Sequence, residues 1–164
     1  MAYKQGGNML LYEIPGRENI EIENIVFDYN GTIAVNGKLI QGVEEAINTL
    51  SKSLNVFILT ADTYGTVEDQ CKGIKAKILT FTRENAGESK RDIVKKLGSS
   101  KTITIGNGFN DVPMFKEAIL SIGIIEGEGM SGSLIMESDI VVGNIIDGIN
   151  IVGNKNMVKA TLRN

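Results

Sequence analysis

The chain has 164 residues, of which 42% are hydrophobic and 23% charged, and its formal net charge is −3. This length suits one globular domain, and the slightly acidic balance without a long basic run argues against a nucleic-acid partner. There is no histidine, and Cys71 is the only cysteine. These counts exclude an intrachain disulfide, histidine-assisted nucleophiles and histidine-ligated metals. A single cysteine fits a reducing compartment, so we expect a cytoplasmic protein. No apolar run approaches the ~20 residues of a membrane span, so we expect no membrane contacts.

The N-terminal part has little regular pattern. Residues 1–8 are polar and glycine-rich, so we expect a loosely ordered start. Residues 9–14 are expected to form a short strand that ends at the Pro15-Gly16 turn. We therefore divide the chain into an N-terminal extension, residues 1–21, with this additional strand, and a core domain, residues 22–164.

The first central strand ends at Asp28. Three apolar residues, Ile25-Val26-Phe27, run into this aspartate, and Asn-Gly-Thr follows. A short apolar run closed by turn residues is typical of a buried strand in a parallel sheet. Ligands of such sheets lie outside the carboxyl ends of the strands, where Asp28 would be, and Gly31 would give the loop a permissive backbone. The alternative is a plain turn in which Asp28 serves as a capping side chain.

The remaining elements alternate between strands and helices. Asn36-Gly37 within residues 33–40 predicts a type I′ hairpin. Apolar spacing predicts strands at 24–29, 56–59, 76–81, 101–105, 119–125 and 139–142, and helices at 43–53, 63–72, 88–97, 130–137, 145–152 and 155–162, with a further helix that ends near 118. This alternation predicts a three-layer α/β fold, a Rossmann-like parallel sheet with helices on both faces and right-handed crossovers.

Polar clusters follow three of the predicted strands. They are Asp28–Thr32, Thr60–Asp62 and Asn107–Asp111. Because the carboxyl ends of parallel strands meet at one edge of the sheet, we expect these clusters to lie together.

As an ordered set these residues resemble a known family. Asp-x-Asn-Gly-Thr from Asp28, Thr-Ala-Asp from Thr60, Lys90 near a helix start and Gly-Asn-Gly-x-Asn-Asp from Gly106 are similar to the four motifs of the haloacid dehalogenase (HAD) superfamily. The likeness is closest to the soluble P-type ATPase-like phosphatases and covers roughly residues 22–163. It implies a HAD-like core, Mg²⁺ as cofactor, and hydrolysis of a small phosphorylated molecule or phosphoprotein through an aspartyl phosphate.

The resemblance also assigns roles to residues. Asp28 would be the nucleophile, the main-chain carbonyl of Asn30 would contact Mg²⁺, and Lys90 would neutralise negative charge. The resemblance implies that the catalytic residues are Asp28, Asn30, Thr60 and Lys90. It implies that the substrate is bound by Gly31, Thr32, Ala61, Asp62 and Asn110. The metal would be bound by Asp28, Asn30, Asn107 and Asp111. Several of these residues also have a purely structural interpretation. Thr60, Asn110 or Asp111 could simply cap the helix that follows. Lys95 or Lys96 could be the family lysine in place of Lys90, whose side chain would then be solvated.

Two positions depart from the family pattern. Most phosphatases of the superfamily have an aspartate where this chain has Asn30, and an amide cannot act as a general acid or base, a contribution worth roughly 10²–10⁴-fold. Asn107 stands where the family usually has a metal-binding aspartate. Its amide oxygen can still bind a metal, and Mg²⁺ is often held by only one or two carboxylates.

The motif spacing leaves no room for an inserted domain. Only 31 residues separate Asp28 from Thr60, and 29 separate Thr60 from Lys90. We therefore expect a core with no cap domain, no nucleotide-binding domain and an open site. A neighbouring subunit would then supply the cover, which predicts a homo-oligomer.

Three functions fit these features. The first is a slow Mg²⁺-dependent phosphatase that favours good leaving groups. The second is a phosphate-binding regulatory module with little or no turnover, which Asn30 and Asn107 favour. The third, a receiver-like phosphoacceptor, is ranked last because no acidic pair precedes Asp28 at a suitable strand end.

Overall fold

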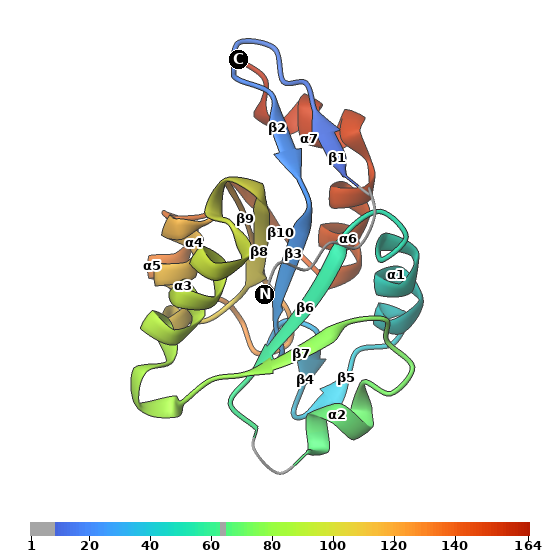
Figure 1. Cartoon of the computed structure of the whole chain (residues 1–164), viewed down its shortest axis with the longest axis vertical. Helices are drawn as coiled ribbons and strands as arrows, with labels where there is room; N and C mark the ends of the chain where they lie inside the picture. Colours follow the sequence, from blue (N-terminus) through green and yellow to red (C-terminus); the bar gives the residue numbers. More distant parts are fainter. Residues whose placement is uncertain (1–8, 63–64) are drawn as a thin grey trace.

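In a computed structural model that describes residues 9–62 and 65–164, a central sheet lies between two layers of helices (Figure 1). The sheet has six parallel strands in the order β10-β9-β8-β3-β6-β7. Their bounds are Asn24–Asp28 (β3), Asn55–Thr60 (β6), Lys77–Thr80 (β7), Thr102–Gly106 (β8), Leu120–Ile124 (β9) and Ile140–Val142 (β10). The predicted three-layer α/β fold is confirmed, and no cap domain is found among the described residues.

The strand order creates a switch point beside β3. From β3 the chain adds β6 and β7 on one side of the sheet, and then crosses to add β8, β9 and β10 on the other. The loops that leave β3 and β8 therefore diverge, and ligands of open parallel sheets bind at such points. Asp28 is the last residue of β3, and Asn107 follows the last residue of β8.

Helices on each face bury a separate core. One face carries α1 (Val43–Leu50), α2 (Thr66–Gln70), α6 (Ile145–Gly153) and α7 (Lys155–Leu162); the other carries α3 (Ala86–Leu97), α4 (Val112–Glu117) and α5 (Gly132–Ile135). Alternate residues of β3 face the two layers: Ile25 and Phe27 join the first core, and Val26 joins the second. Burial on both faces explains why this strand is a continuous apolar run.

A separate antiparallel hairpin precedes the sheet. It consists of β1 (Leu10–Tyr12), within the stretch where a strand was expected, and β2 (Ile20–Ile22), which was not expected because three residues give too short a pattern. β1 packs against α7, and the buried Tyr12 hydroxyl donates a hydrogen bond to the Val152 carbonyl over 2.7 Å. The division at residue 21 stays a prediction.

The predicted hairpin beside the site is formed by β4 (Ala34–Val35) and β5 (Lys38–Leu39). Asn36 and Gly37 both have positive φ angles, as a type I′ turn requires. The backbone N–H of Asn36 donates a hydrogen bond to Glu128 Oε1 over 3.0 Å, so the tip of the hairpin is bound to the loop after β9.

Four helices differ from the expected bounds by two residues or more. The helix expected at 43–53 ends at Leu50, because residues 51–53 form a turn. α3 begins at Ala86 instead of residue 88, and its first turn packs closely on α4: a Cβ on Gly87 would lie 2.9 Å from Pro113 Cγ. α2 and α5 are shorter than the patterns at 63–72 and 130–137 suggested, and residues 63 and 64 lie outside the described part. The expected loose start at residues 1–8 also lies outside it.

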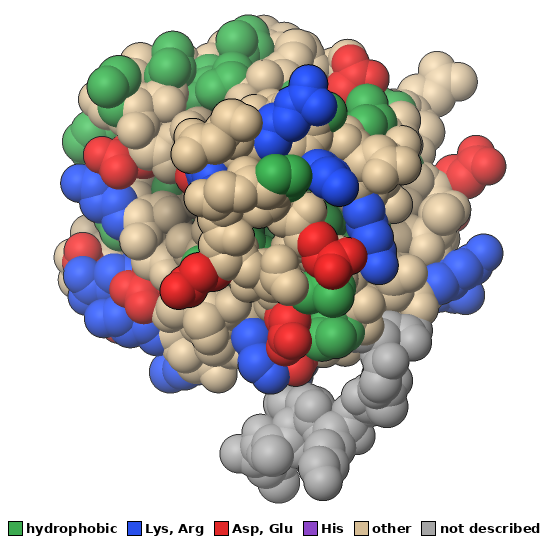
Figure 2. All heavy atoms as spheres, turned by 90° about the horizontal axis from the view of Figure 1, so that it is seen from above, with side chains coloured by type: hydrophobic (Ala, Val, Ile, Leu, Met, Phe, Trp, Pro, Cys, Tyr) green, Lys and Arg blue, Asp and Glu red, His purple; other side chains and the backbone are tan. Residues whose placement is uncertain are grey.

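The surface carries mixed charge. Figure 2 shows acidic and basic side chains interspersed over the face seen from above, where α7 and the β1–β2 hairpin lie in Figure 1. Within residues 9–62 and 65–164, no helix has the length and apolar character needed to cross a bilayer.

Candidate active site

A pocket of about 600 Å³ opens at the carboxyl ends of the central strands. Asp28 from β3, Thr60 from β6 and Lys90 from α3 line it, with Asn107 and Asn110 from the loop after β8. The three polar clusters expected at one sheet edge are thus brought together. Asn30, Ala61 and Asp62 line the same pocket.

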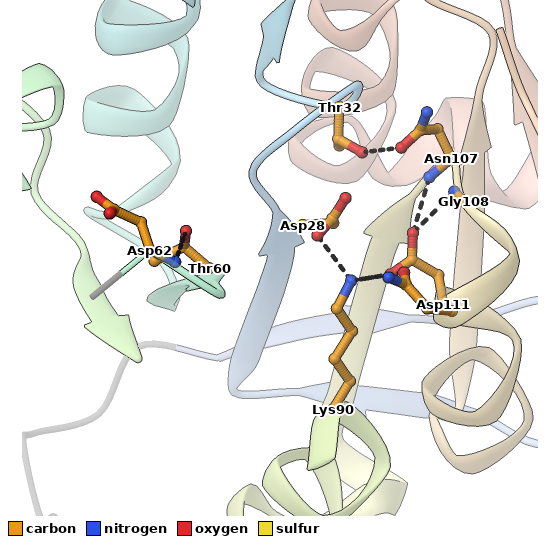
Figure 3. Close-up of polar contacts among 9 residues, drawn as sticks. Asp28, Thr32, Thr60, Asp62, Lys90, Asn107, Gly108 and Asp111 are labelled. Atoms are coloured by element: carbon orange, nitrogen blue, oxygen red, sulfur yellow. Dashed lines mark hydrogen bonds and ion pairs between the residues drawn. The ribbon is translucent and has the colours of Figure 1, made fainter. Parts of the chain in front are cut away.

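Lys90 is the centre of a buried polar cluster. Its side chain is 1% exposed, and Nζ donates to Asp28 Oδ1 over 2.7 Å, to Asp111 Oδ1 over 2.6 Å and to Asn110 Oδ1 over 2.9 Å. An ammonium has three N–H donors, so all three are engaged. Nζ also lies 4.9 Å from the centre of the Phe81 ring. Figure 3 shows the second oxygen of Asp28 pointing away from Lys90.

Asp111 is placed differently from the expected metal ligand. It is fully buried, with one oxygen on Lys90, and Oδ2 accepts hydrogen bonds from the backbone amides of Asn107 and Gly108 over 3.1 and 2.9 Å. Asp111 does not line the pocket. The turn also requires Gly106, where a Cβ would lie 2.4 Å from Asp111 Oδ2. In this structure the carboxylate therefore positions Lys90 and the loop.

The Asn107 amide is held from both sides. Its Oδ1 accepts from the Thr32 hydroxyl over 3.2 Å, and its Nδ2 donates to the Gly129 carbonyl over 3.0 Å. Gly31, with φ of 78°, passes so close that a Cβ would lie 2.3 Å from Asn107 Nδ2. Gly31 and Thr32, expected to bind substrate, do not line the pocket and instead support Asn107.

Thr60 and Asp62 form a second group on the β6 side, apart from the Lys90 cluster (Figure 3). The Thr60 hydroxyl accepts a hydrogen bond from the Asp62 amide over 3.0 Å. Asp62 Oδ2 accepts from the Thr66 hydroxyl over 2.6 Å and from the Val67 amide over 2.9 Å, so this carboxylate holds the first turn of α2. Capping of the next helix was the structural alternative for Thr60. In the structure it is Asp62, and not Thr60, whose side chain accepts a hydrogen bond from a backbone amide in the first turn of that helix.

Two carboxylates share one ammonium in this cluster. Burial, followed by the nearby charge of Asp111, raises the pKa of the Asp28 carboxyl to about 7, although Lys90 acts in the opposite direction. Burial alone would lower the pKa of Lys90, but the Asp111 and Asp28 carboxylates raise it. Lys90 is therefore charged, and the excess negative charge favours a bound cation.

The donors at the pocket floor fit Mg²⁺. The described residues contain no group of three or more His, Cys, Asp or Glu arranged to hold a metal. Asp28 and Asn107 nevertheless offer carboxylate and amide oxygens in the pocket, and Mg²⁺ is commonly held by one or two carboxylates together with substrate phosphate and water. The oxygen-only donor set suits this ion and does not suit zinc.

Several pocket residues were missed by sequence reasoning. Phe81, Arg83, Ala86, Phe109 and Glu128 also line the pocket. Phe109 lies inside the predicted Gly-Asn-Gly-x-Asn-Asp motif, at its variable position. The others lie in segments without a local motif, and the fold brings them to the site.

Comparisons with known proteins agree with this geometry. A family profile described as haloacid dehalogenase-like hydrolase matches residues 7–118. A soluble P-type ATPase-like phosphatase of Methanocaldococcus jannaschii is 30% identical over 123 residues, which are 73% of this chain and 45% of that protein. The match thus spans less than half of this relative. An uncharacterized protein of the same organism is 42% identical over 72 residues, 44% of this chain and 77% of the relative.

A solved structure shows the same fold. It is the 3-deoxy-D-manno-octulosonate 8-phosphate phosphatase of Moraxella catarrhalis, in complex with a magnesium ion, a phosphate ion and a KDO molecule. The TM-score is 0.62 at 19% identity, over 87% of this chain and 94% of that chain. The ordered motifs, the six-stranded sheet and the family profile lead to one assignment: the chain belongs to the haloacid dehalogenase-like hydrolase family, as its resemblance to the soluble P-type ATPase-like phosphatases indicated.

Proposed function

We propose that this protein is a Mg²⁺-dependent phosphohydrolase that forms an aspartyl phosphate at Asp28. The observation that carries the proposal is the 2.7 Å contact between the Asp28 carboxylate and the buried Lys90 ammonium at the floor of the pocket. Family membership and the phosphatase names of the relatives support it. The substrate class is a small phosphorylated molecule or a phosphoprotein, and the proposed location is the cytoplasm.

The reaction proceeds in two displacements. An oxygen of Asp28 attacks phosphorus, and the bond from phosphorus to the leaving oxygen breaks. Water then cleaves the aspartyl phosphate, releasing inorganic phosphate and restoring the carboxylate. Lys90 orients Asp28 and offsets its charge, while the Thr60 hydroxyl and backbone amides at the pocket floor donate to phosphoryl oxygens.

Mg²⁺, when bound, would neutralise charge on the phosphoryl group. The Asp28 carboxylate, the Asn107 amide oxygen and the main-chain carbonyl of Asn30 would hold it. Asp111 would act through Lys90, because both of its oxygens are engaged within the protein. With a single carboxylate directly on the metal, we expect Mg²⁺ to bind weakly until the substrate phosphate adds its own oxygens.

A phosphatase assay tests the proposal directly. Purified protein should hydrolyse p-nitrophenyl phosphate in millimolar Mg²⁺, and EDTA should remove the activity. Acid-quenched protein incubated with substrate should carry one phosphoryl group, which mass spectrometry of the peptide containing Asp28 would locate. Activity that persists in EDTA would contradict the metal requirement, and a phosphoryl group on another residue would contradict the assignment of Asp28.

Asn30 determines which leaving groups are tolerated. It is exposed in the pocket, and its amide cannot protonate a leaving oxygen or activate water. Acyl and aryl phosphates, which leave as stable anions, should therefore react much faster than alkyl phosphates.

Asn30→Asp should restore the acid–base group and raise turnover of an alkyl phosphate by about 10-fold or more. The test is to measure the steady-state turnover of the wild type and of Asn30→Asp on one aryl phosphate and one alkyl phosphate. An unimproved alkyl substrate, together with no preference of the wild type for good leaving groups, would show that position 30 has another role.

The alternative function is a phosphate-binding regulatory module with little or no turnover. The complete engagement of the Lys90 ammonium with protein oxygens and the amides at positions 30 and 107 favour it. Saturable phosphate binding without hydrolysis of any phosphorylated substrate would distinguish this function. For either function we propose that a second copy covers the open pocket, which light scattering on the fully active protein would test.

A further inference from the structure

The active-site pocket continues into a second depression. This depression has a volume of about 450 Å³ and lies over the start of α3 and the start of α4. Arg83, Ala86, Phe109 and Asn110 line both depressions, so they form the border between them. A group attached to a phosphoryl at Asp28 would pass these four residues on its way out of the pocket.

Phe109 presents an aromatic ring to solvent at this border. Its side chain is 70% exposed, whereas the other aromatic residues in the described part of the chain are buried or half-buried. The residue lies in a 3-10 turn whose backbone is held by the Asp111 contacts to Asn107 and Gly108, so the position from which the ring projects is defined. A flat ligand group stacked on this ring would remove its surface from water, which is favourable.

Arg83 is a cation at the same border. Its exposed side chain makes no ion pair with any of residues 9–62 and 65–164. Lys90, the other basic residue that lines the pocket, has all three of its donors engaged. Two acidic residues, Glu84 and Glu88, line the second depression. Neither forms an ion pair with Arg83, and Glu88 is paired with Arg91. Arg83 is therefore the cation placed to receive an anionic group of a ligand.

We propose that Phe109 and Arg83 select the leaving group, and that the substrate is a phosphate ester or acyl phosphate whose leaving group is aromatic and carries a carboxylate. The ring stacks on Phe109, and the carboxylate pairs with Arg83. This inference rests on the proposed function, because it places the phosphoryl group of the substrate at Asp28. Such a leaving group departs as a stabilised anion, which matches a site without an acid at position 30.

Non-hydrolysable phosphonates test the inference without requiring turnover. Isothermal calorimetry in Mg²⁺ should show that 4-carboxybenzylphosphonate binds more tightly than benzylphosphonate, and benzylphosphonate more tightly than methylphosphonate. Phe109→Ala should weaken both benzyl compounds by about 5-fold relative to methylphosphonate. Arg83→Gln should weaken only the carboxylated compound, by about 3- to 10-fold.

Met157→Ala on α7 and Arg163→Gln directly after it are the control variants, because α7 lies at the opposite end of the molecule (Figure 1). Arg163→Gln repeats the change made at Arg83, and Met157→Ala likewise truncates a large exposed apolar side chain. Neither should alter the order of the three ligands. Equal affinity of the wild type for all three compounds, absence of binding, or equal weakening of all three by Arg83→Gln would overturn the inference. If the expected binding pattern is found but the protein hydrolyses no phosphorylated substrate, the recognition of an aromatic carboxylate by Phe109 and Arg83 stands and the proposed phosphohydrolase function is refuted.

Discussion

Asp28→Asn should lower the hydrolysis of p-nitrophenyl phosphate by about 10³-fold or more while the protein stays folded. The amide has the same shape as the carboxylate but cannot attack phosphorus, and the chain has no histidine to supply another route. Its oxygen can still accept a hydrogen bond from Lys90, so we expect an unchanged circular dichroism spectrum. Asp92→Asn is the matched control, because Asp92 is exposed on the same helix as Lys90. Equal hydrolysis by the Asp28→Asn and Asp92→Asn proteins would rule out Asp28 as the nucleophile.

The same substitution should change how stability depends on pH in EDTA. The pKa of Asp28 is raised from 3.8 to about 7, so the folded protein binds this proton more tightly than the unfolded chain. Below about pH 4 this group should not make the free energy of unfolding depend on pH. As the pH rises from about 4 toward 7, the free energy of unfolding should fall by at most ~1.4 kcal/mol per pH unit. Urea unfolding of Asp28→Asn should lack this decrease. Parallel pH profiles of the two proteins would contradict the raised pKa of the buried Asp28 carboxyl.

The parallel sheet could be predicted from short-range patterns. Helices cover both faces of the sheet, so its central strands are continuous apolar runs, Ile25-Val26-Phe27 and Val56-Phe57-Ile58-Leu59. A few consecutive residues are enough to recognise a strand that is buried on both faces. The true start of α3 could not be predicted in this way. In the first turn of α3, Gly87 packs against Pro113, which is a contact between two elements separated in the sequence.

The residues of the candidate site also fall into those that short-range patterns predict and those that depend on tertiary contacts. Asp28 and Thr60 are the last residues of their strands, and Asn107 directly follows one, so the sheet itself places them in the pocket. In the sequence, Asp111 belongs to the same polar motif as Asn107 and was expected to face the ligand with it. The 3-10 turn after Gly108 instead directs its carboxylate onto backbone amides and Lys90. Arg83 belongs to a segment without a motif. Its position depends on how the chain passes from β7 to α3, which only the tertiary structure reveals.

Lys90→Met should be the most damaging single substitution in the cluster. It removes the one cation between Asp28 and Asp111 and leaves two carboxylates buried next to each other. Breaking a buried ion pair in this way costs about 3–5 kcal/mol of stability, and activity should be lost as well. Lys96→Met, an exposed position on the same helix, is the control and should change stability by no more than about 0.5 kcal/mol. Urea unfolding at pH 8 measures both.

A second substitution separates stability from catalysis. In the Lys90→Met background, Asp111→Asn removes one of the two stranded charges, so part of the lost stability should return. Activity should not return, because Asp28 would still lack the ammonium that orients it and offsets its charge. If the double variant is no more stable than Lys90→Met, repulsion between the two carboxylates is not what destabilises it. If instead activity recovers together with stability, Lys90 supports the fold alone, and the charge needed for phosphoryl transfer must come from another residue.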